Sequence, residues 1–166
     1  MKILQYMPEY VAHLLIIEDE PITRRMLSSH FENEGYAVTG MPNAEGVLER
    51  ISEGRIDACL IDINLPGKDG LTLTREIRAR SDVGIILVTG KDDQVDRIVG
   101  LESGADDYMT KPFDPRELLS RVKNLLRRVR AQEKQKEKGS TRTFEGWVLD
   151  LNKREISTPD GTWQAL

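Results

Sequence analysis

The chain has 166 residues, which is enough for one ordinary domain but not for two large ones. Its net charge of -4 argues against a polycation that coats nucleic acid, and its single cysteine excludes an internal disulfide framework. No apolar run approaches the roughly 20 residues that a membrane-spanning helix needs. We therefore expect a globular protein of the cytoplasm, with no signal peptide and no membrane partner.

Five short apolar runs alternate with amphipathic stretches between residues 13 and 130. The runs predict strands at 14–17, 37–39, 58–61, 85–88 and 108–110. Helical spacing predicts a helix after each strand: from Pro21 to Gly35, from Asn43 to Glu53, from Leu71 to Arg80, around Val95–Leu101, and from Asp114 or Pro115 to about Val129. Helices are the usual crossovers between parallel strands. The predicted fold is α/β, a doubly wound five-stranded parallel sheet with helices on both faces.

Local signals refine the first two helices. Asn43 is of the residue type that caps a helix, so we expect it to begin the second one. The first helix is predicted from residues that recur at helical spacing and form an apolar stripe: Ile22, Met26, Leu27, His30 and Phe31.

Composition divides the chain into four parts. Residues 1–12 form an extension of unknown purpose, and residues 13–130 form the main domain. Residues 131–142 are highly charged and lack large apolar side chains, which predicts a linker that can be helical at its start. Residues 143–166 contain two expected strands, at 144–150 and 155–157, and the beginning of a third at Trp163. A sheet of so few strands cannot bury a core by itself. We therefore interpret this part as the beginning of another domain.

Charged and hydroxyl side chains follow the predicted strands. Glu18 and Asp19 end the first, Asp62 the third, Thr89 the fourth, and Lys111 lies just after the fifth. In a parallel sheet the carboxyl ends of the strands share one edge, where ligands of doubly wound folds bind. These five side chains are therefore expected to meet.

The expected cluster suits phosphoryl chemistry with Mg²⁺. Three carboxylates close together are unfavourable unless a cation neutralises them, and Mg²⁺ prefers such oxygen ligands. We expect Asp19 and Asp62 as direct ligands, Glu18 through water, and the backbone carbonyl of Asn64 as a further oxygen. Asp62 is the predicted nucleophile, because a carboxylate can attack phosphorus to form an acyl phosphate. Lys111 and Thr89 would contact the phosphoryl oxygens.

Two other functions fit the residues less well. A phosphatase of the haloacid dehalogenase type needs a second aspartate two residues after the nucleophile, and Asn64 occupies that position. A turnover enzyme is therefore not expected. A nucleotide-binding protein would carry a glycine-rich loop after its first strand, where this chain has Glu-Asp-Glu-Pro at 18–21.

The chain resembles the receiver domain of two-component response regulators. The resemblance is carried by Leu-Ile-Ile-Glu-Asp-Glu-Pro at 15–21, Asp-Ile-Asn-Leu-Pro-Gly-Lys-Asp-Gly at 62–70, Val-Thr-Gly at 88–90 and Gly-Ala-Asp-Asp-Tyr-Met-Thr-Lys-Pro-Phe at 104–113. It is similar to the OmpR/PhoB subfamily, in the branch of TorR and ArcA. Residues 144–166 look like the opening sheet of that subfamily's winged-helix DNA-binding domain.

The resemblance implies a strand order of 2-1-3-4-5 and a site that works as a switch. Asp62 would accept a phosphoryl group from a sensor histidine kinase, with Mg²⁺ at the residues given above. Thr89 and Tyr108 would change position on phosphorylation, and a cis peptide bond would precede Pro112.

The resemblance also implies a homodimer on phosphorylation and promoter DNA as the target of the parent protein. The dimer would use the face of the fourth helix, fifth strand and fifth helix. Its expected ion pairs between two copies are Arg97 with Glu117, Asp107 with Arg121, and Asp106 with Arg128. A stand-alone receiver that signals by protein contacts, without DNA, is the alternative.

Overall fold

The computed structural model describes residues 10–90 and 94–166, without the side chains of 94–97 and 138. Most of the expected extension 1–12, and the side chain of Arg97, therefore lie outside the described residues. The chain divides into two compact units, Met1–Leu126 and Arg127–Leu166, and the last helix runs through both.

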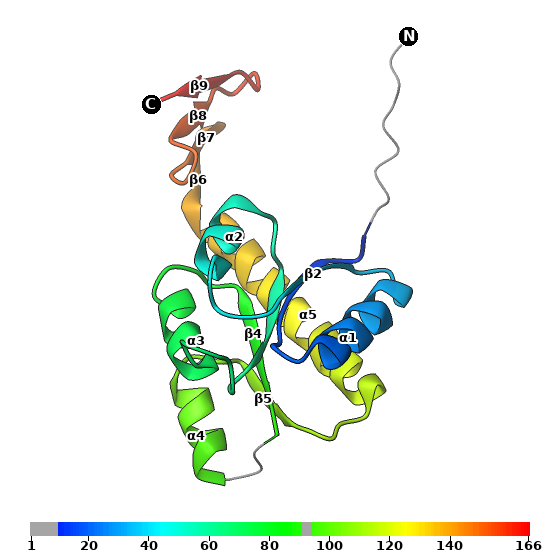
Figure 1. The fold of residues 1–166 in the computed structure, drawn as a ribbon. Coiled ribbons are helices and arrows are strands. Elements are labelled where there is room, and N and C mark those ends of the chain that lie inside the picture. Colours follow the sequence, from blue (N-terminus) through cyan, green and yellow to red (C-terminus); the bar gives the residue numbers. More distant parts are fainter. Residues whose placement is uncertain (1–9, 91–93) are drawn as a thin grey trace. The chain divides into compact units, whose positions relative to one another are not determined.

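The first unit is built on one parallel sheet of five strands (Figure 1). The strands are β1 (His13–Ile17), β2 (Ala37–Met41), β3 (Ala58–Asp62), β4 (Gly84–Thr89) and β5 (Asp107–Thr110). Their order is β2-β1-β3-β4-β5, which confirms both the predicted fold class and the implied strand order. Ile17 lies opposite Ile61, and Asp62 lies opposite Val88. The carboxyl ends of the three central strands therefore share one edge of the sheet.

Helices cover both faces of this sheet. They are α1 (Pro21–Asn33), α2 (Val47–Glu53), α3 (Gly70–Arg78), α4 (Gln94–Glu102) and α5 (Pro115–Ser140). In Figure 1, α1 and α5 lie on one side of the sheet, and α2, α3 and α4 lie on the other.

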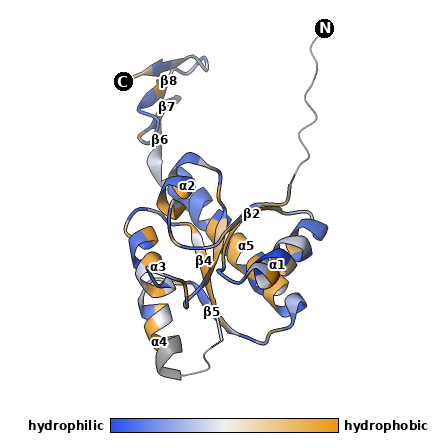
Figure 2. Cartoon of the chain, viewed as in Figure 1, coloured by the Kyte–Doolittle hydropathy of each residue, from blue (hydrophilic) through white to orange (hydrophobic). Residues whose placement is uncertain are grey.

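The core lies between the sheet and its helices. All residues of β3 and β4 are buried, as expected for strands covered on both faces. Figure 2 shows the hydrophobic residues gathered on the strands and on the helix sides that face them. One buried cluster joins alternate strand residues such as Ile17, Ile61 and Leu87 to Leu73 and Ile77 of α3. Truncating such a side chain to alanine costs about 2–5 kcal/mol, so this core holds the ends of the strands in fixed register.

The first helix buries fewer residues than its apolar pattern predicts. Leu27 and Phe31 are buried, but Ile22 is 78% exposed and Met26 is 50% exposed, so only part of the apolar stripe faces the sheet. Five residues separate Ile22 from Leu27, which places them about 140° apart around a helix of 3.6 residues per turn. The sheet accommodates only one of these two directions.

The second helix starts later than predicted. It begins at Val47, and Gly46 occupies the cap position with a φ of 77°. Asn43 instead accepts a hydrogen bond from the Glu45 amide at 2.9 Å, which makes a turn before the helix. The left-handed conformation of Gly46 interrupts the helical path, so Asn43 is not the cap.

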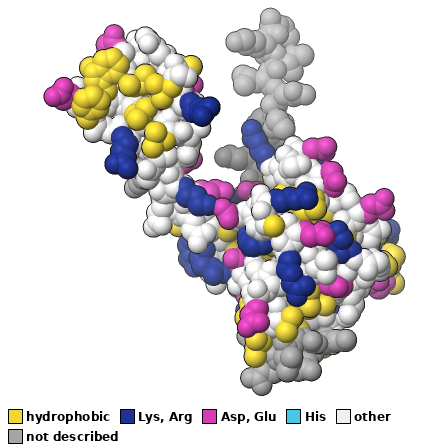
Figure 3. Space-filling model, turned by 90° about the vertical axis from the view of Figure 1, so that its left-hand side faces the viewer, with side chains coloured by type: hydrophobic (Ala, Val, Ile, Leu, Met, Phe, Trp, Pro, Cys, Tyr) yellow, Lys and Arg dark blue, Asp and Glu magenta, His cyan; other side chains and the backbone are white. Residues whose placement is uncertain are grey.

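The second unit contains the end of α5 and a separate antiparallel sheet. The strands are β6 (Thr141–Phe144), β7 (Trp147–Asp150), β8 (Glu155–Ser157) and β9 (Trp163–Ala165), paired in sequence order. The segment expected to be a linker is helical up to Ser140, because its Ala, Gln, Glu and Lys residues all favour helix. Phe144, Trp163 and Leu166 are at least half exposed, and Figure 3 shows hydrophobic side chains gathered on this unit.

Among the described residues, no helix has the length and apolar character needed to cross a membrane.

Candidate functional site

Two acidic residues follow β1 and turn the chain into α1. Glu18 is only 3% exposed, whereas the Asp19 side chain is exposed. The Glu18 amide donates to the Met41 carbonyl at 3.0 Å, which continues the pairing of β1 with β2. Glu20 caps α1, since its carboxylate accepts hydrogen bonds from the amides of Ile22 and Thr23. The start of the helix thereby fixes the loop that carries both acids.

Asp62 ends β3 beside these acids. It is 7% exposed, and its Oδ1 accepts a hydrogen bond from the Asn64 amide at 2.9 Å. One carboxylate oxygen from each of Glu18, Asp19 and Asp62 lies within 4.8 Å of the others. The predicted meeting of the three carboxylates is therefore present in the structure.

Lys111 supplies a cation to the same cluster. Its Nζ lies 2.6 Å from Glu18 Oε2 and 2.9 Å from Asp62 Oδ2. Its amide donates to the Thr89 carbonyl at 2.6 Å, and its peptide bond to Pro112 is cis. The lysine is thus held by its backbone at the end of β4 while its side chain reaches the acids.

Burial and charge act in opposite directions on the pKa values here. Burial raises the pKa of Glu18, and this outweighs the hydrogen bond from Lys111. Burial lowers the pKa of Lys111, but its hydrogen bonds to Glu18 and Asp62 outweigh burial, so its pKa is raised overall. The ammonium form of Lys111 is therefore favoured, while ionisation of Glu18 is less favourable than in water.

The two residues expected to switch are both buried. Thr89 is 0% exposed at the end of β4, opposite Thr110 of β5. Tyr108 is 4% exposed and belongs to the core cluster. A Cβ added at Gly100 would lie 3.1 Å from the Tyr108 ring, so the ring packs closely on α4. The expected movement of these residues stays a prediction.

Four residues of the expected dimer face form contacts within a single chain: Asp106, Asp107, Glu117 and Arg121. Arg121 pairs with Asp107 at 2.9 Å and with Glu117 at 2.8 Å. Asp106 pairs with Arg78 of α3 at 3.0 Å and also accepts from the Ile85 amide. Arg128 is exposed and belongs to the second unit. The expected pairs between two copies remain predictions.

Two residues that support the site were not assigned a role from the sequence. Gly70 begins α3 directly against β3, and a Cβ there would overlap the Asp62 carbonyl oxygen. Arg24 of α1 donates to the carbonyls of Glu18 and Asp19. The glycine was part of the matching motif, whereas no local signal shows that Arg24 points back to the loop.

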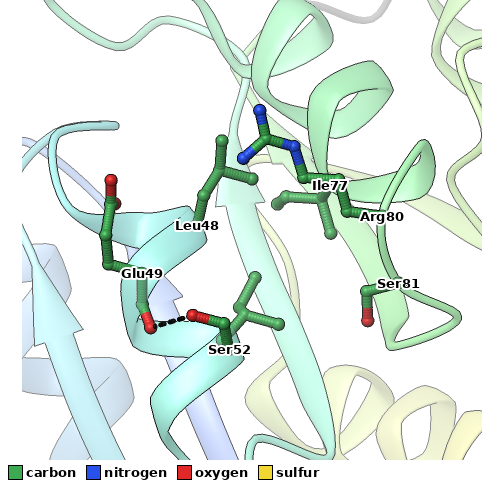
Figure 4. Close-up of a pocket in the computed structure, with 7 residues that line it drawn as sticks. Leu48, Glu49, Ser52, Ile77, Arg80 and Ser81 are labelled. Atoms are coloured by element: carbon green, nitrogen blue, oxygen red, sulfur yellow. Dashed lines mark hydrogen bonds between the residues drawn. The ribbon is translucent and has the colours of Figure 1, made fainter.

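A separate pocket of about 350 Å³ lies between α2 and α3 (Figure 4). Leu48 and Ile77 form part of its apolar lining, and Glu49, Ser52 and Arg80 add polar groups. None of the predicted site residues is among its lining residues.

Comparisons with known proteins agree with this fold. Residues 14–123 match the response regulator receiver domain family, and the chain belongs to that family. The predicted OmpR/PhoB subfamily is confirmed, and relatives from the expected branch are among the matches.

Three matches illustrate the relationship. The transcriptional regulatory protein AruR of Pseudomonas aeruginosa is 48% identical over 153 residues, covering 88% of this chain and 63% of AruR. The aerobic respiration control protein ArcA of Escherichia coli is 46% identical over 152 residues, covering 90% of this chain and 64% of ArcA. The crystal structure of the TorR receiver domain, from the TMAO respiratory system, has a TM-score of 0.67 and 55% identity, covering 71% of this chain and 98% of that one. This chain spans less than two thirds of the length of AruR and ArcA.

Proposed function

We propose that Asp62 accepts a phosphoryl group from the phosphorylated histidine of a sensor kinase, with Mg²⁺ bound beside it. The observation that carries this proposal is the position of the Asp62 carboxylate, which lies beside two other acids and pairs with the Lys111 ammonium. We further propose that phosphorylation controls transcription by the whole protein.

The residues present fit a magnesium ion. All three side chains offer carboxylate oxygens, which Mg²⁺ prefers over nitrogen or sulfur ligands. Burial raises the pKa of Glu18 and so disfavours its ionised form relative to water, and a divalent cation would favour that ionised form. Asp19 and Asp62 would be direct ligands, and Glu18 would act through water. The Asn64 carbonyl would be the remaining protein oxygen that binds the ion.

The chain's own residues account for the transfer step. An Asp62 oxygen forms a bond to phosphorus while the bond from phosphorus to the histidine nitrogen breaks, and the imidazole leaves. The Lys111 ammonium, 2.9 Å from Asp62 Oδ2, is placed to pair with an oxygen of the transferred group. The Thr89 hydroxyl would donate a hydrogen bond to an oxygen of the same group. Positioning and charge compensation supply most of the catalysis in phosphoryl transfer.

Phosphoryl uptake is tested by intact mass after incubation with a small acyl phosphate and Mg²⁺. We expect one phosphoryl addition to the wild type and none to Asp62→Asn, because a carboxamide does not attack phosphorus. Circular dichroism of the variant should match the wild type. An equal mass gain in folded Asp62→Asn would assign the acceptor to another residue.

The second unit supports a role in DNA binding by the whole protein. Its small antiparallel sheet leaves Phe144 and Trp163 at least half exposed, and the register places them on opposite faces of the sheet. Exposed apolar side chains on both faces need further layers to cover them. AruR carries the name of a transcriptional regulatory protein and extends beyond the matched region. We favour this function over a stand-alone receiver for both reasons.

We also propose that phosphorylation brings two copies together through α4, β5 and α5. Ile98 is 51% exposed and Leu101 is 43% exposed, so α4 offers apolar surface that a partner copy would cover. Charges of both signs lie nearby on β5 and α5, which a self-complementary two-fold interface requires.

A further inference from the structure

Arg24 connects α1 to the loop that carries two of the site's acids. It lies in the first turns of the helix, and its side chain points back toward β1. Its Nη1 donates to the Glu18 carbonyl at 2.7 Å and lies 3.3 Å from the Asp19 carbonyl. One guanidinium therefore holds the backbone of both residues.

The neighbouring strand leaves room for this side chain. Gly40 of β2 lies opposite Ile16 of β1, one residue before the end of that strand. A Cβ added at Gly40 would lie 3.2 Å from Arg24 Cδ and 3.3 Å from Cγ. Glycine inside a strand often marks a close approach by another group, and here that group is the Arg24 side chain.

The Glu18 carbonyl depends on this donor. Glu18 is 3% exposed, so its backbone has little access to water. A buried carbonyl that loses its donor carries a desolvation penalty, and the loop would turn to find another partner. Such a turn would move the carboxylates of both Glu18 and Asp19, because they are attached to the same short stretch of backbone.

We propose that Arg24 is a positioning residue for the cation site, which it serves by fixing the Glu18 and Asp19 backbone. This proposal rests on the proposed function of the acidic cluster as a Mg²⁺ site. The contacts of Arg24 are with carbonyl oxygens, whereas Lys111 pairs with the carboxylates themselves. Its role is therefore in the geometry of the ligands and not in the charge that they carry.

Positioning and charge predict opposite effects of removing Arg24. If its positive charge dominated, its loss would strengthen Mg²⁺ binding, because like charges repel. If positioning dominates, its loss weakens Mg²⁺ binding. Replacing groups that orient metal ligands typically lowers metal affinity roughly 10–100-fold, which is the weakening that we expect for Arg24→Met.

The experiment is calorimetric titration of the unphosphorylated protein with MgCl₂. Arg24→Met is compared with the wild type and with Arg25→Met, a matched control on the exposed side of the same helix. Arg24→Lys keeps one cationic donor, so its affinity should fall between those of Arg24→Met and the wild type; it also provides the test if Arg24→Met does not fold. Hydrogen exchange of the Glu18–Glu20 amides should accelerate in Arg24→Met and stay unchanged in Arg25→Met.

The outcomes separate this inference from the proposed function. Weaker Mg²⁺ binding by Arg24→Met alone, with faster exchange in the loop, supports positioning. Unchanged or stronger binding by a folded Arg24→Met, or by Arg24→Lys where Arg24→Met does not fold, overturns the role of Arg24 but leaves the metal site intact. A wild type that does not bind Mg²⁺ overturns the proposed cation site itself, and the inference with it.

Discussion

At the scale of single residues, ionisable side chains with reduced access to water lie at both ends of the sheet. At the carboxyl edge, Lys111 bridges two acids that burial would otherwise disfavour. At the amino edge, His13 contacts Thr39 through its ring, and its backbone amide donates to Asp57 at 2.7 Å. Burial lowers the pKa of His13, Arg50 lowers it further, and Asp57 acts in the opposite direction.

The lowered pKa of His13 predicts how stability depends on pH. The unfolded chain binds a proton on this residue near the ordinary value of 6.5, and the folded protein binds it only at lower pH. This contribution to stability is therefore complete above about pH 6.5 and is lost as pH falls through the folded pKa. We would measure the free energy of unfolding with urea at pH 7.5, 6.5 and 5.5. As the pH falls, this free energy should decline less in His13→Asn than in the wild type. Equal declines would show that other groups determine the pH dependence.

At the scale of elements, α3 is attached to the end of β3 by a contact that tolerates no side chain. Asp69 caps the helix by accepting from the Thr72 amide at 2.8 Å, and this hydrogen bond lowers its pKa. The Gly70 amide donates to the Ile63 carbonyl at 2.8 Å. The backbone of Asp62 thus lies directly against the first turn of the helix, so the acceptor position depends on where α3 begins.

Gly70→Ala should therefore destabilise the protein. The added Cβ would overlap the Asp62 carbonyl oxygen, and relieving that overlap requires a backbone shift. Overpacking of this kind costs about 1–3 kcal/mol, which urea unfolding would measure as a loss in the free energy of unfolding. Gly139→Ala is the control, because a Cβ there meets open space in a helix and should cause no loss. A Gly70→Ala variant as stable as the wild type would show that α3 can move away from β3.

At the scale of the whole molecule, the proposed dimer must replace contacts that each chain already makes. Asp107 and Glu117 both pair with Arg121 within the chain. If these pairs exchange across a two-fold axis, the number of ion pairs changes little, and exposed pairs contribute only about 0–1 kcal/mol each. Burial of Ile98 and Leu101 would then provide much of the affinity between the two copies. The charged residues would determine which face of each copy forms the interface.

Charge reversal at Arg121 tests this face. Arg121→Glu places a negative charge beside Asp107 and Glu117 in both copies, so the phosphorylated variant should dimerise more weakly than the wild type. Arg55→Glu makes the same charge change at an exposed position before β3 and serves as the control. Sedimentation velocity of the phosphorylated proteins measures the effect. Equal dimer fractions in wild type and Arg121→Glu would point to another interface.

The sequence by itself determined the sheet, its helices and the residues that meet at its edge. Strands buried on both faces appear as continuous apolar runs, and the residue after each run then falls at the edge where parallel strands end. Glu18, Asp62, Thr89 and Lys111 could be found for this reason. The same local signals found the positions of the five helices, although not the start of α2.

Only the tertiary structure decided which partners these residues have. Ile22 and Leu27 both fit a helical stripe, but packing against the sheet selected Leu27. Arg24 and the carbonyls that it contacts are five or six residues apart, and the position of Gly40 that makes room for it depends on pairing between β1 and β2. Asp106 and Arg78 are 28 residues apart, and they form an ion pair within the chain. Such contacts depend on how elements pack, which local periodicity does not specify.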